Sequence, residues 1–391
     1  MNRPIVIIGG GVIGSAIAYF TLTDPAFRGT VTVVERDPTY ARASSALSAS
    51  SIRQQFSTAI NIDIGRFGIE FLRRAGDALA VDGDRPSFGL VEPGYLFLAT
   101  AAGSPVLERN HALQRSHGVD VALLDAVGLH ARFPWLATND LAAGSLGLSG
   151  EGWFDGWSLM QAFRRKARAL GANYLTGEGS GFDVDGGRIA ALRLADGSRV
   201  AGEWFVDAAG PWAAQVAGWV GIDLPVRARR RSVFVYSCAT PLPRCPLVID
   251  PSGLWFRPEG ARQYLCGISP DETDDPDDAR LEVDHALFNQ VLWPLLAARV
   301  PAFEAIRATS AWSGYYELNT VDRNGIVGPH PEIPNLVFAN GFSGHGLQQS
   351  PAVGRGVAEL LVHGGYRALD LAPLAFDRFA RNAPIVELNV V

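Results

Sequence analysis

The sequence feature that constrains the fold most is a βαβ unit at residues 4–35. It opens with a β-branched run typical of a buried parallel strand, continues with helical spacing, and ends in a second apolar strand. A glycine-rich turn of the form Gly-x-Gly-x-x-Gly joins the first strand to the helix. Such a unit predicts an α/β fold with a parallel sheet covered by helices. The three glycines of the turn are Gly9, Gly11 and Gly14.

The turn has the chemistry needed to bind a dinucleotide. Gly9 permits the tight turn, Gly11 lets a pyrophosphate approach the backbone, and Gly14 lets the helix pack on the strand. The unpaired amides at the helix N-terminus then attract the phosphates. Glu35 lies 21 residues beyond Gly14, where a carboxylate accepts from ribose hydroxyls and would repel a 2′-phosphate, which disfavours NADP. This motif alone does not separate NAD from FAD, and a glycine-rich turn without a ligand is the alternative.

Composition excludes several other classes of protein. The 391 residues are 48% hydrophobic and 19% charged, with a net charge of −6, which is a globular balance and argues against a nucleic-acid partner. The only lysine is Lys166, so no GxxxxGK phosphate loop can be written. No stretch of about eighteen uncharged apolar residues is present that could span a bilayer.

Cysteine usage and the start of the chain predict the compartment. The three cysteines show no CxxC spacing and have no histidine at ligand spacing, which favours reduced thiols and argues against a metal site. Only Met1 to Arg3 precede the first strand, which leaves no room for a signal peptide. We therefore expect a cytoplasmic protein. The cysteines are Cys238, Cys245 and Cys266.

Segments typical of nucleotide-binding domains occur at the beginning, in the middle and at the end of the chain. The segments between them contain strands typical of an antiparallel sheet. This alternation predicts two domains that are both discontinuous. The first, nucleotide-binding domain is expected to comprise residues 1–86, 150–222 and 323–391. The second is expected to comprise residues 87–149 and 223–322.

Helical spacing predicts further helices at residues 60–74, 157–170, 282–298 and 350–363. Residues 41–51 are small and polar, so we expect them to form a loop that lies on another part of the molecule.

Two further segments have small residues where a flat cofactor can lie against the backbone. Residues 206–212 (VDAAGPW) place them at a strand end, and a tight strand–loop crossing is the alternative. Residues 340–348 (NGFSGHGLQ) place them around one histidine just ahead of a helix, so that backbone amides can approach an electron-rich ring edge. His345 in this segment is either a satisfied structural histidine or a direct participant in the chemistry.

Together these motifs resemble the FAD-dependent oxidoreductases of the D-amino-acid oxidase and sarcosine oxidase class. The resemblance begins at residue 4, runs to the C-terminus, and is most specific in the C-terminal part. Residues 311–349 are most similar to mitochondrial FAD-dependent oxidoreductase-domain proteins that assist respiratory complex I assembly. The resemblance implies a Rossmann-like FAD-binding domain and a discontinuous substrate domain built on a mostly antiparallel sheet, with the isoalloxazine between them.

Motif by motif, the resemblance also implies a set of FAD contacts. The glycine-rich turn would hold the pyrophosphate, Glu35 the adenosine ribose, and the serine-rich loop the flavin. Donors of the C-terminal loop would lie near N1 and O2, where the reduced ring gathers negative charge. The implied contacts are Gly9, Gly11, Val12, Ile13, Gly14, Glu35, Arg36, Ser44, Ser45, Ser48, Gly179, Ala209, Gly210, Gly344, His345, Gly346, Leu347 and Gln348.

Departures from that class change the expected chemistry. No cysteine lies near residues 315–320, where monomeric sarcosine oxidases link one to the flavin, so FAD is expected to be non-covalent. Gln348 replaces a lysine, and Leu265 stands at the place of the lysine that promotes reaction with oxygen. Arg53 aligns with an arginine on the active face of the flavin, and a surface ion pair is its alternative. The catalytic candidates are Arg53, Tyr264, Tyr315 and His345, and the further candidates for substrate contact are Tyr95, Tyr316 and Arg257.

These observations predict an FAD enzyme that oxidises a C–N bond in a secondary amine or amino acid by hydride transfer to flavin N5. Because no second Gly-x-Gly-x-x-Gly unit is present for NAD(P)H, electrons should enter from the organic substrate. They would leave to a quinone, an electron-transfer protein or oxygen, and a dehydrogenase is favoured over an oxidase. The alternatives are a 2-hydroxy-acid dehydrogenase, a flavin-binding assembly factor without turnover, and an NAD-dependent dehydrogenase. The sequence is compatible with an oligomer.

Overall fold

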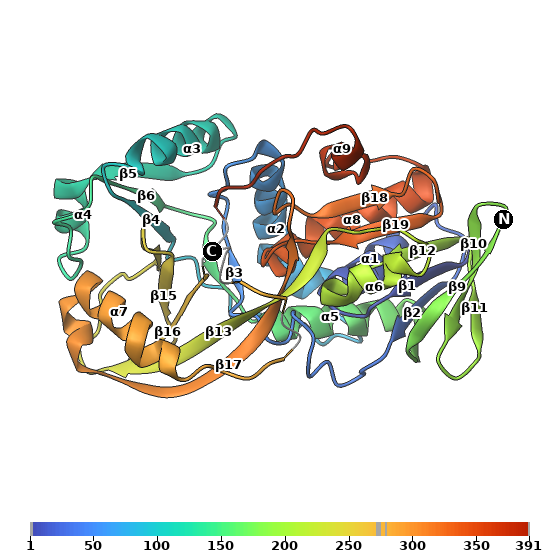
Figure 1. Cartoon of the computed structure of the whole chain (residues 1–391), viewed down its shortest axis with the longest axis horizontal. Helices are drawn as coiled ribbons and strands as arrows, with labels where there is room; N and C mark the ends of the chain where they lie inside the picture. The colour runs from blue at the N-terminus through green and yellow to red at the C-terminus, as the bar shows by residue number, and fades with distance from the viewer. Residues whose placement is uncertain (1–2, 271–274, 278–279, 390–391) are drawn as a thin grey trace.

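Two large β-sheets lie side by side along the long axis of the molecule (Figure 1). The computed structural model describes residues 3–270, 275–277 and 280–389. The first sheet consists of β1 (Ile5–Ile8), β2 (Val31–Glu35), β8 (Asn173–Thr176), β12 (Trp204–Asp207), β18 (Ile326–Pro329) and β19 (Leu336–Asn340). Its order is β18-β19-β12-β1-β2-β8, and every neighbouring pair is parallel except β18 with β19.

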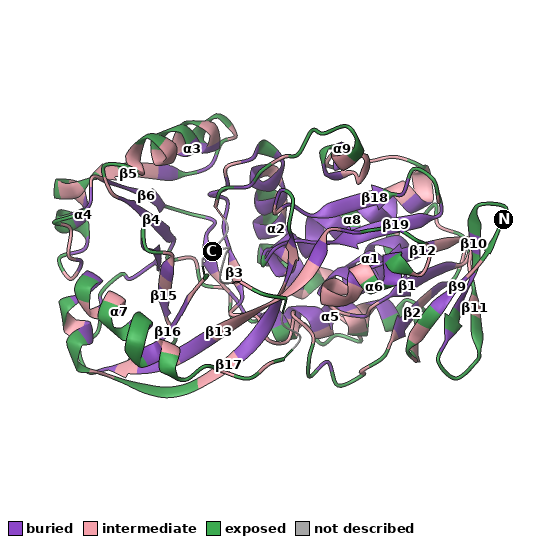
Figure 2. Ribbon diagram, in the orientation of Figure 1, coloured by how far each residue is buried: buried purple, intermediate pink, exposed green. Residues whose placement is uncertain are grey.

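The six-stranded sheet is buried on both faces, as a parallel sheet requires (Figure 2). Ile5 and Ile7 face a layer of helices, whereas Val6 and Ile8 face a small antiparallel sheet. The helical layer contains α1 (Val12–Thr23), α2 (Ala59–Ala78), α5 (Gly156–Ala169) and α8 (Gly346–His363). The opposite layer contains β9 (Gly179–Asp185), β10 (Arg188–Leu194), β11 (Arg199–Ala201) and α6 (Ala213–Gly218).

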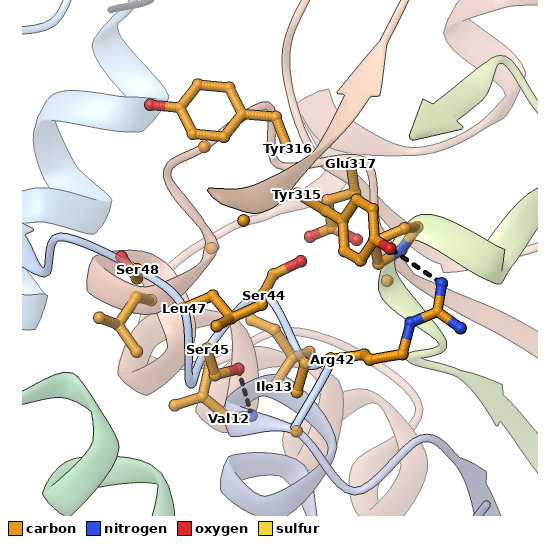
Figure 3. Close-up of a pocket in the computed structure, with 18 of the residues that line it drawn as sticks. Val12, Ile13, Arg42, Ser44, Ser45, Leu47, Ser48, Tyr315, Tyr316 and Glu317 are labelled. Carbon is orange, nitrogen blue, oxygen red and sulfur yellow. Dashed lines mark hydrogen bonds between the residues drawn. The ribbon is translucent and has the colours of Figure 1, made fainter. Parts of the chain in front are cut away.

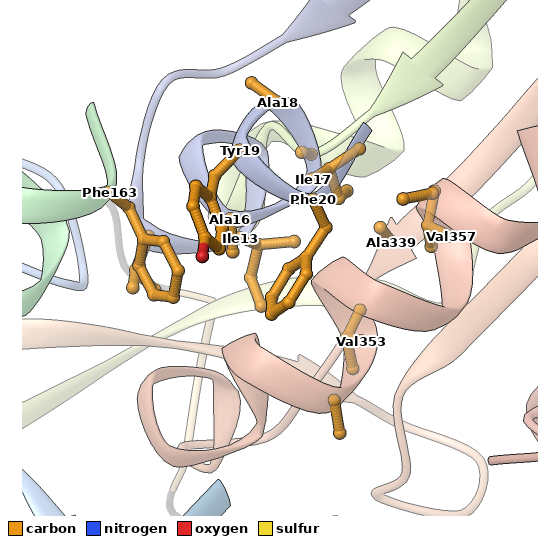
Figure 4. Close-up of a cluster of buried hydrophobic side chains, with 14 of the residues drawn as sticks. Ile13, Ala16, Ile17, Ala18, Tyr19, Phe20, Phe163, Ala339, Val353 and Val357 are labelled. Atoms are coloured by element: carbon orange, nitrogen blue, oxygen red, sulfur yellow. The ribbon is translucent and has the colours of Figure 1, made fainter. Parts of the chain in front are cut away.

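Helix α1 occupies the centre of the helical layer, between α5 and α8 (Figure 4). Its residues from Val12 to Thr21 are all buried, because a helix that is apolar on all sides must be covered on all sides. Tyr19 and Phe20 pack against Phe163 of α5, with ring centroids 5.5 and 6.3 Å apart. This packing fixes the N-terminus of α1 at the end of β1, where the glycine-rich turn lies.

The second large sheet is antiparallel in every neighbouring pair except β14 with β4, which is parallel. Its order is β17-β13-β16-β15-β14-β4-β6-β5. The strands are β4 (Tyr95–Ala99), β5 (Val121–Asp125), β6 (Ala143–Gly147), β13 (Val226–Cys238), β14 (Leu247–Ile249), β15 (Leu254–Pro258), β16 (Gln263–Ile268) and β17 (Ile306–Asn319). Around it lie α3 (Ser104–Ser116), α4 (Ala126–Arg132), α7 (Trp293–Arg299) and the turns Phe288–Leu292 and Pro301–Ala305.

Short elements connect and complete these layers. Strands β3 and β7 form a two-stranded sheet between the two large ones. The C-terminal segment crosses back over α2 after α9 (Figure 1). The bounds are β3 (Ser51–Ile52), β7 (Gly152–Trp153), a 3-10 turn at Gly210–Trp212, another at Ala372–Leu374, and α9 (Asp377–Ala380).

The fold class expected from the sequence, a Rossmann-like α/β unit with a mostly antiparallel second sheet, is confirmed. The strands of the six-stranded sheet all fall in the segments expected for the first domain, and those of the eight-stranded sheet in the segments expected for the second. The exact domain boundaries stay a prediction. No helix within the described residues is long and apolar enough to cross a membrane.

Two predicted helices start at other residues than expected. The helix predicted at 282–298 starts only after Asp284, whose side chain accepts from the amide of Ala286 at 3.0 Å and forms a turn. The helix predicted from Ser350 starts at Gly346, so Pro351 lies inside it. Pro351 has no amide to donate to the carbonyl of Leu347, and the Ser350 hydroxyl donates to that carbonyl instead, at 2.9 Å.

Candidate active site

An elongated cavity of about 450 Å³ runs from the carboxyl ends of β1 and β2 to the eight-stranded sheet. Its walls come from the three parts of the chain with nucleotide-type signals and from strands of the second sheet. At one end it is lined by the glycine-rich turn and Glu35, and at the other by Tyr95, Trp255 and Arg257. The serine-rich loop and residues 314–317 form the walls between these ends. The cavity therefore connects a nucleotide-type site with a surface of the second sheet.

The glycine-rich turn is tightly enclosed. Gly9 has φ +98°, and a Cβ there would overlap the carbonyl oxygen of Ala208. A Cβ on Gly14 would overlap the carbonyl oxygen of Gly9, so a side chain at 14 would force α1 away from β1. The amide of Val12 donates to the hydroxyl of Ser45 at 3.1 Å, which places the serine-rich loop directly over the helix N-terminus (Figure 3).

Glu35 is held at the end of β2 by two backbone amides. Its Oε2 accepts from Gly10 at 2.8 Å, and its Oε1 accepts from Asp37 at 2.8 Å. A carboxylate oxygen can accept more than one hydrogen bond, so this side chain is oriented and still able to accept from a ribose hydroxyl. Arg36 follows it, and its guanidinium stacks 3.8 Å from the ring centre of Trp212 on the opposite wall.

Replacing Glu35 by alanine is expected to weaken FAD binding about tenfold or more. The substitution removes a charge-assisted hydrogen bond worth about 1.5–3 kcal/mol. The measurement is the dissociation constant of FAD from fluorescence quenching. Glu178→Ala is the matched control, because Glu178 lines the same end of the cavity with a side chain that is 61% exposed. Equal FAD retention by the Glu35→Ala variant and the control would contradict the assignment.

The serine-rich loop lies on the second sheet, as expected for a loop of small residues. The carbonyl of Leu47 accepts from the indole of Trp312 at 2.9 Å, and the carbonyl of Ala49 accepts from Arg257 at 2.7 Å. Arg42 donates to the hydroxyl of Tyr315 at 2.9 Å (Figure 3). The loop therefore spans from the N-terminus of α1 to the eight-stranded sheet and covers the middle of the cavity.

Most of the residues that the sequence analysis assigned to the cofactor or the substrate line this cavity, and their roles there stay predictions. The residues that do not line it are Gly14, Arg53, Tyr264, His345 and Gln348. Those that do line it are Gly9, Gly11, Val12, Ile13, Glu35, Arg36, Ser44, Ser45, Ser48, Tyr95, Gly179, Ala209, Gly210, Arg257, Tyr315, Tyr316, Gly344, Gly346 and Leu347.

Arg53 and His345 lie together behind the cavity wall. Arg53 is 1% exposed, and its guanidinium contacts Nε2 of His345 at 2.8 Å and donates to the carbonyls of Gln55 and Asn389. The side-chain oxygen of Gln348 accepts from the Arg53 amide at 2.9 Å. These side chains are thus occupied by one another and by the C-terminal segment, and their expected roles beside the flavin stay predictions. Burial and the neighbouring guanidinium lower the pKa of His345 well below its usual value, so the ring is neutral.

Tyr264 does not line the cavity either, and its expected role stays a prediction. Its ring stacks on Tyr236 at 5.5 Å in the core of the second sheet, and its hydroxyl accepts from the amide of Leu242 at 3.0 Å. The reason is the alternation of side chains along a strand. Arg257, which pairs across the strands with Leu265, points to the cavity side, and Tyr264 points to the other.

Glu317 was missed by the sequence analysis. It lines the cavity between the serine-rich loop and the loop before α8, and burial raises its pKa to about 8. A single glutamate in an apolar strand is a weak signal, because the sequence does not tell which side of β17 faces a cavity. Tyr315, Tyr316 and Glu317 are consecutive and all line the cavity, so strand alternation does not single out Glu317.

The cavity fits FAD by the chemistry of its lining. The turn around Gly9 is a cradle that any side chain would fill, and the amides at the start of α1 attract a pyrophosphate. Among the described residues, the Ser44 hydroxyl and one oxygen of Glu317 are buried without a hydrogen-bond partner. Both point into the middle of the cavity (Figure 3), where a polar ligand would satisfy them.

A cavity that begins at such a turn and ends against an antiparallel sheet is the arrangement of a two-domain flavoprotein oxidoreductase. The chain belongs to the family described as FAD dependent oxidoreductase (DAO), whose pattern matches residues 4–360. It therefore binds FAD, as the sequence predicted. Within the described residues, no group of three or more histidine, cysteine, aspartate and glutamate side chains could hold a metal ion.

Individual relatives are similar over the whole chain. FAD-dependent oxidoreductase domain-containing protein 1 of Xenopus laevis is 44% identical, over 100% of this chain and 85% of its own length. The glycine oxidase of Geobacillus kaustophilus is 28% identical, over 96% of each chain. Among solved structures, L-proline dehydrogenase from P. horikoshii superposes with a TM-score of 0.84 at 25% identity, covering 98% of this chain and 99% of that one.

FAD is expected to be released intact when the protein is denatured. All three cysteines are buried in or beside the core of the second sheet, and none of them lines the cavity. Precipitation with acid should therefore leave a colourless pellet and a yellow supernatant. A pellet that keeps the flavin colour would show a covalent bond and contradict this prediction.

Proposed function

We propose that this protein is an FAD-dependent dehydrogenase that oxidises the C–N bond of a secondary amine or amino acid. FAD, when bound, supplies the electron acceptor to which the substrate carbon gives its hydride. The task left to the protein is to bind and orient the substrate and to exclude water. The observation that carries the proposal is the far end of the cavity, an aromatic chamber with one buried arginine.

The chamber has the groups that an amino acid requires. Tyr95, Trp255 and Tyr316 form its aromatic lining. Arg257 is 4% exposed, and its terminal nitrogens pair with Glu259 and donate to the carbonyls of Pro258 and Ala49. Its Nε is buried without a partner among the described residues, so this nitrogen is the one left to donate to a substrate carboxylate. Burial raises the pKa of Tyr95 to about 12, which keeps its hydroxyl protonated as a donor. Relatives named glycine oxidase, sarcosine oxidase and L-proline dehydrogenase favour an amine substrate.

Two alternatives remain for the same site. A 2-hydroxy acid would present its carboxylate to Arg257 in the same way. A flavin-binding assembly factor would contain the cofactor without turning over a substrate. The cytoplasmic location and the external electron acceptor stay as predicted from the sequence.

Anaerobic bleaching of the flavin separates these functions. The holoenzyme is mixed without oxygen with N-alkyl amino acids, D-amino acids, L-proline and 2-hydroxy acids. Bleaching by one of the amines supports the proposal, bleaching by hydroxy acids alone supports the first alternative, and no bleaching by any of them supports the second.

Arg257→Met should raise the dissociation constant of a carboxylated substrate about tenfold or more, since a hydrogen bond to a charged group is lost. Its effect on the matching amine without a carboxylate should be small.

A further inference from the structure

Glu317 lies where two cavity loops meet. Its Oε1 is 3.4 Å from the point where a Cβ on Gly346 would lie, and its Oε2 is 3.6 Å from the corresponding point on Gly210. The backbone amides of Gly341 and Phe342, in the loop before α8, favour its ionised form and lower its pKa in part. Its Oε2 is buried and has no hydrogen-bond partner among the described residues, and the residue itself lines the cavity.

Among the described residues, burial and two backbone amides set the pKa of this carboxyl group, without a cation. Burial alone dominates and raises its pKa to about 8, and the two amides lower it only in part. Asp207 on β12 is also buried, and its pKa is raised in part by Glu317. The remaining charged or titratable groups on the packed elements are engaged elsewhere: Arg42 with Tyr315, Arg231 with Asp275 beside the ring of Tyr316, and neutral His345 with Arg53.

The position of Glu317 selects the part of FAD that it can reach. It lies between the N-terminus of α1, which suits the pyrophosphate, and Gly344 at the flavin end of the cavity. The segment of FAD between its two ring systems is rich in oxygen atoms, and the phosphate oxygens there can only accept hydrogen bonds. An ionised carboxylate would repel them, whereas a protonated carboxyl group donates.

We propose that Glu317 binds FAD as a neutral carboxyl group, donating its proton in a hydrogen bond to an oxygen of the segment that links the two ring systems. Glu317 is then a cofactor-positioning residue. Its deprotonation removes the hydrogen-bond donor and leaves a negative charge that repels the phosphate oxygens. This inference concerns retention of the cofactor and holds whichever substrate is oxidised.

The inference predicts a specific pH dependence. FAD affinity should be constant below about pH 8, where the carboxyl group is protonated. Above that value the fraction of protein molecules with a protonated Glu317 falls about tenfold per pH unit. The apparent dissociation constant of FAD should therefore rise about tenfold per pH unit. Glutamine keeps a donor of the same shape but does not titrate in this range. The Glu317→Gln variant should therefore bind FAD at pH 7 within a few-fold of wild type and lose the rise above pH 8.

The experiment measures release of FAD from the full-length holoenzyme on dilution, by recovery of flavin fluorescence, at pH values from about 6.5 to 9.5. Glu317→Ala should bind FAD about tenfold more weakly at pH 7, since it lacks the donor. Glu151→Gln is the matched control, because Glu151 is also fully buried with a pKa raised to about 7 but lies outside the cavity lining. It should keep the wild-type profile. Circular dichroism at each pH confirms that release precedes unfolding.

The possible results decide the matter directly. A flat wild-type profile, an affinity that improves with pH, or an unchanged rise in Glu317→Gln would each overturn the proposal. Loss of the rise in Glu151→Gln as well would show a general effect of buried acids and would also overturn it. If Glu317→Gln does not fold, the wild-type profile and proton release on dissociation of FAD still test the inference.

Discussion

Gly14→Ala should abolish stable FAD binding and lower the free energy of unfolding by about 1–3 kcal/mol. The new Cβ would overlap the carbonyl oxygen of Gly9 and approach Cγ2 of Ile7 at 3.1 Å. The first of these is backbone in a turn that is closed on its other side by Ala208. Relief therefore requires α1 to move away from β1, which displaces the amides that would hold the pyrophosphate. Urea denaturation and the flavin content of the purified protein measure the two effects.

The matched control is Gly218→Ala at the end of α6, where a Cβ meets no atom within 4 Å. Alanine there should leave FAD binding unchanged and should be neutral or stabilising by up to about 1 kcal/mol. Wild-type flavin content in Gly14→Ala would show that the close approach of helix and strand is not needed for binding the cofactor.

The second large expected effect is a slow reaction of the reduced enzyme with oxygen. We expect the substrate-reduced enzyme to react with oxygen about a hundredfold more slowly than with an artificial quinone. Electron transfer to oxygen creates a negative charge, which a nearby cation would stabilise by about 4 kcal/mol at 4 Å and an effective dielectric constant of 20. His345 is neutral, and the only lysine, Lys166, donates to the carbonyl of Ala80. Two arginines that line the cavity already pair with carboxylates, Arg231 with Asp275 and Arg257 with Glu259. Stopped-flow mixing with air-saturated buffer measures the rate.

Leu265→Lys should accelerate the reaction with oxygen. Leu265 is buried opposite Arg257 in the strand pairing, so it lies on the cavity side of the second sheet. Leu265→Met is the control of similar length without charge. Equally fast reoxidation of the wild type by oxygen and quinone would contradict the first expectation. Equal rates in the lysine and methionine variants would contradict the role of charge at this position.

The sequence predicted the nucleotide-binding half of the molecule well for a physical reason. The βαβ unit, its glycines and Glu35 lie within residues 4–35, so strand, turn and helix are specified by local patterns. The three-stranded sheet of β9, β10 and β11 lies outside the predicted elements. Strands β9 and β11 are mostly polar or small, whereas β10 nearly alternates exposed and buried residues and could have been predicted. The start of α8 was displaced because Pro351 is tolerated once a side chain replaces its missing hydrogen bond.

The substrate end of the site was predicted less completely. By residue type, Tyr264 and Arg257 are equally plausible as substrate contacts. Only the register of the eight-stranded sheet places Tyr264 in the core and Arg257 in the cavity lining. A one-residue shift between β15 and β16 would place both side chains on the same face of the sheet. Arg53 matched a motif, yet its guanidinium is enclosed by groups from residues more than 290 positions away in the chain.

The sequence by itself therefore determined the α/β class, the FAD-type turn and the acidic residue that would receive the ribose. These depend on contacts between residues close together in the chain. The tertiary structure alone decided which side chains reach the cavity, the occupation of Arg53 by His345 and the C-terminal segment, and the burial of an unpartnered Glu317 oxygen at the cavity wall. Strand register and burial set these features, and both arise from packing between segments that are distant in the sequence.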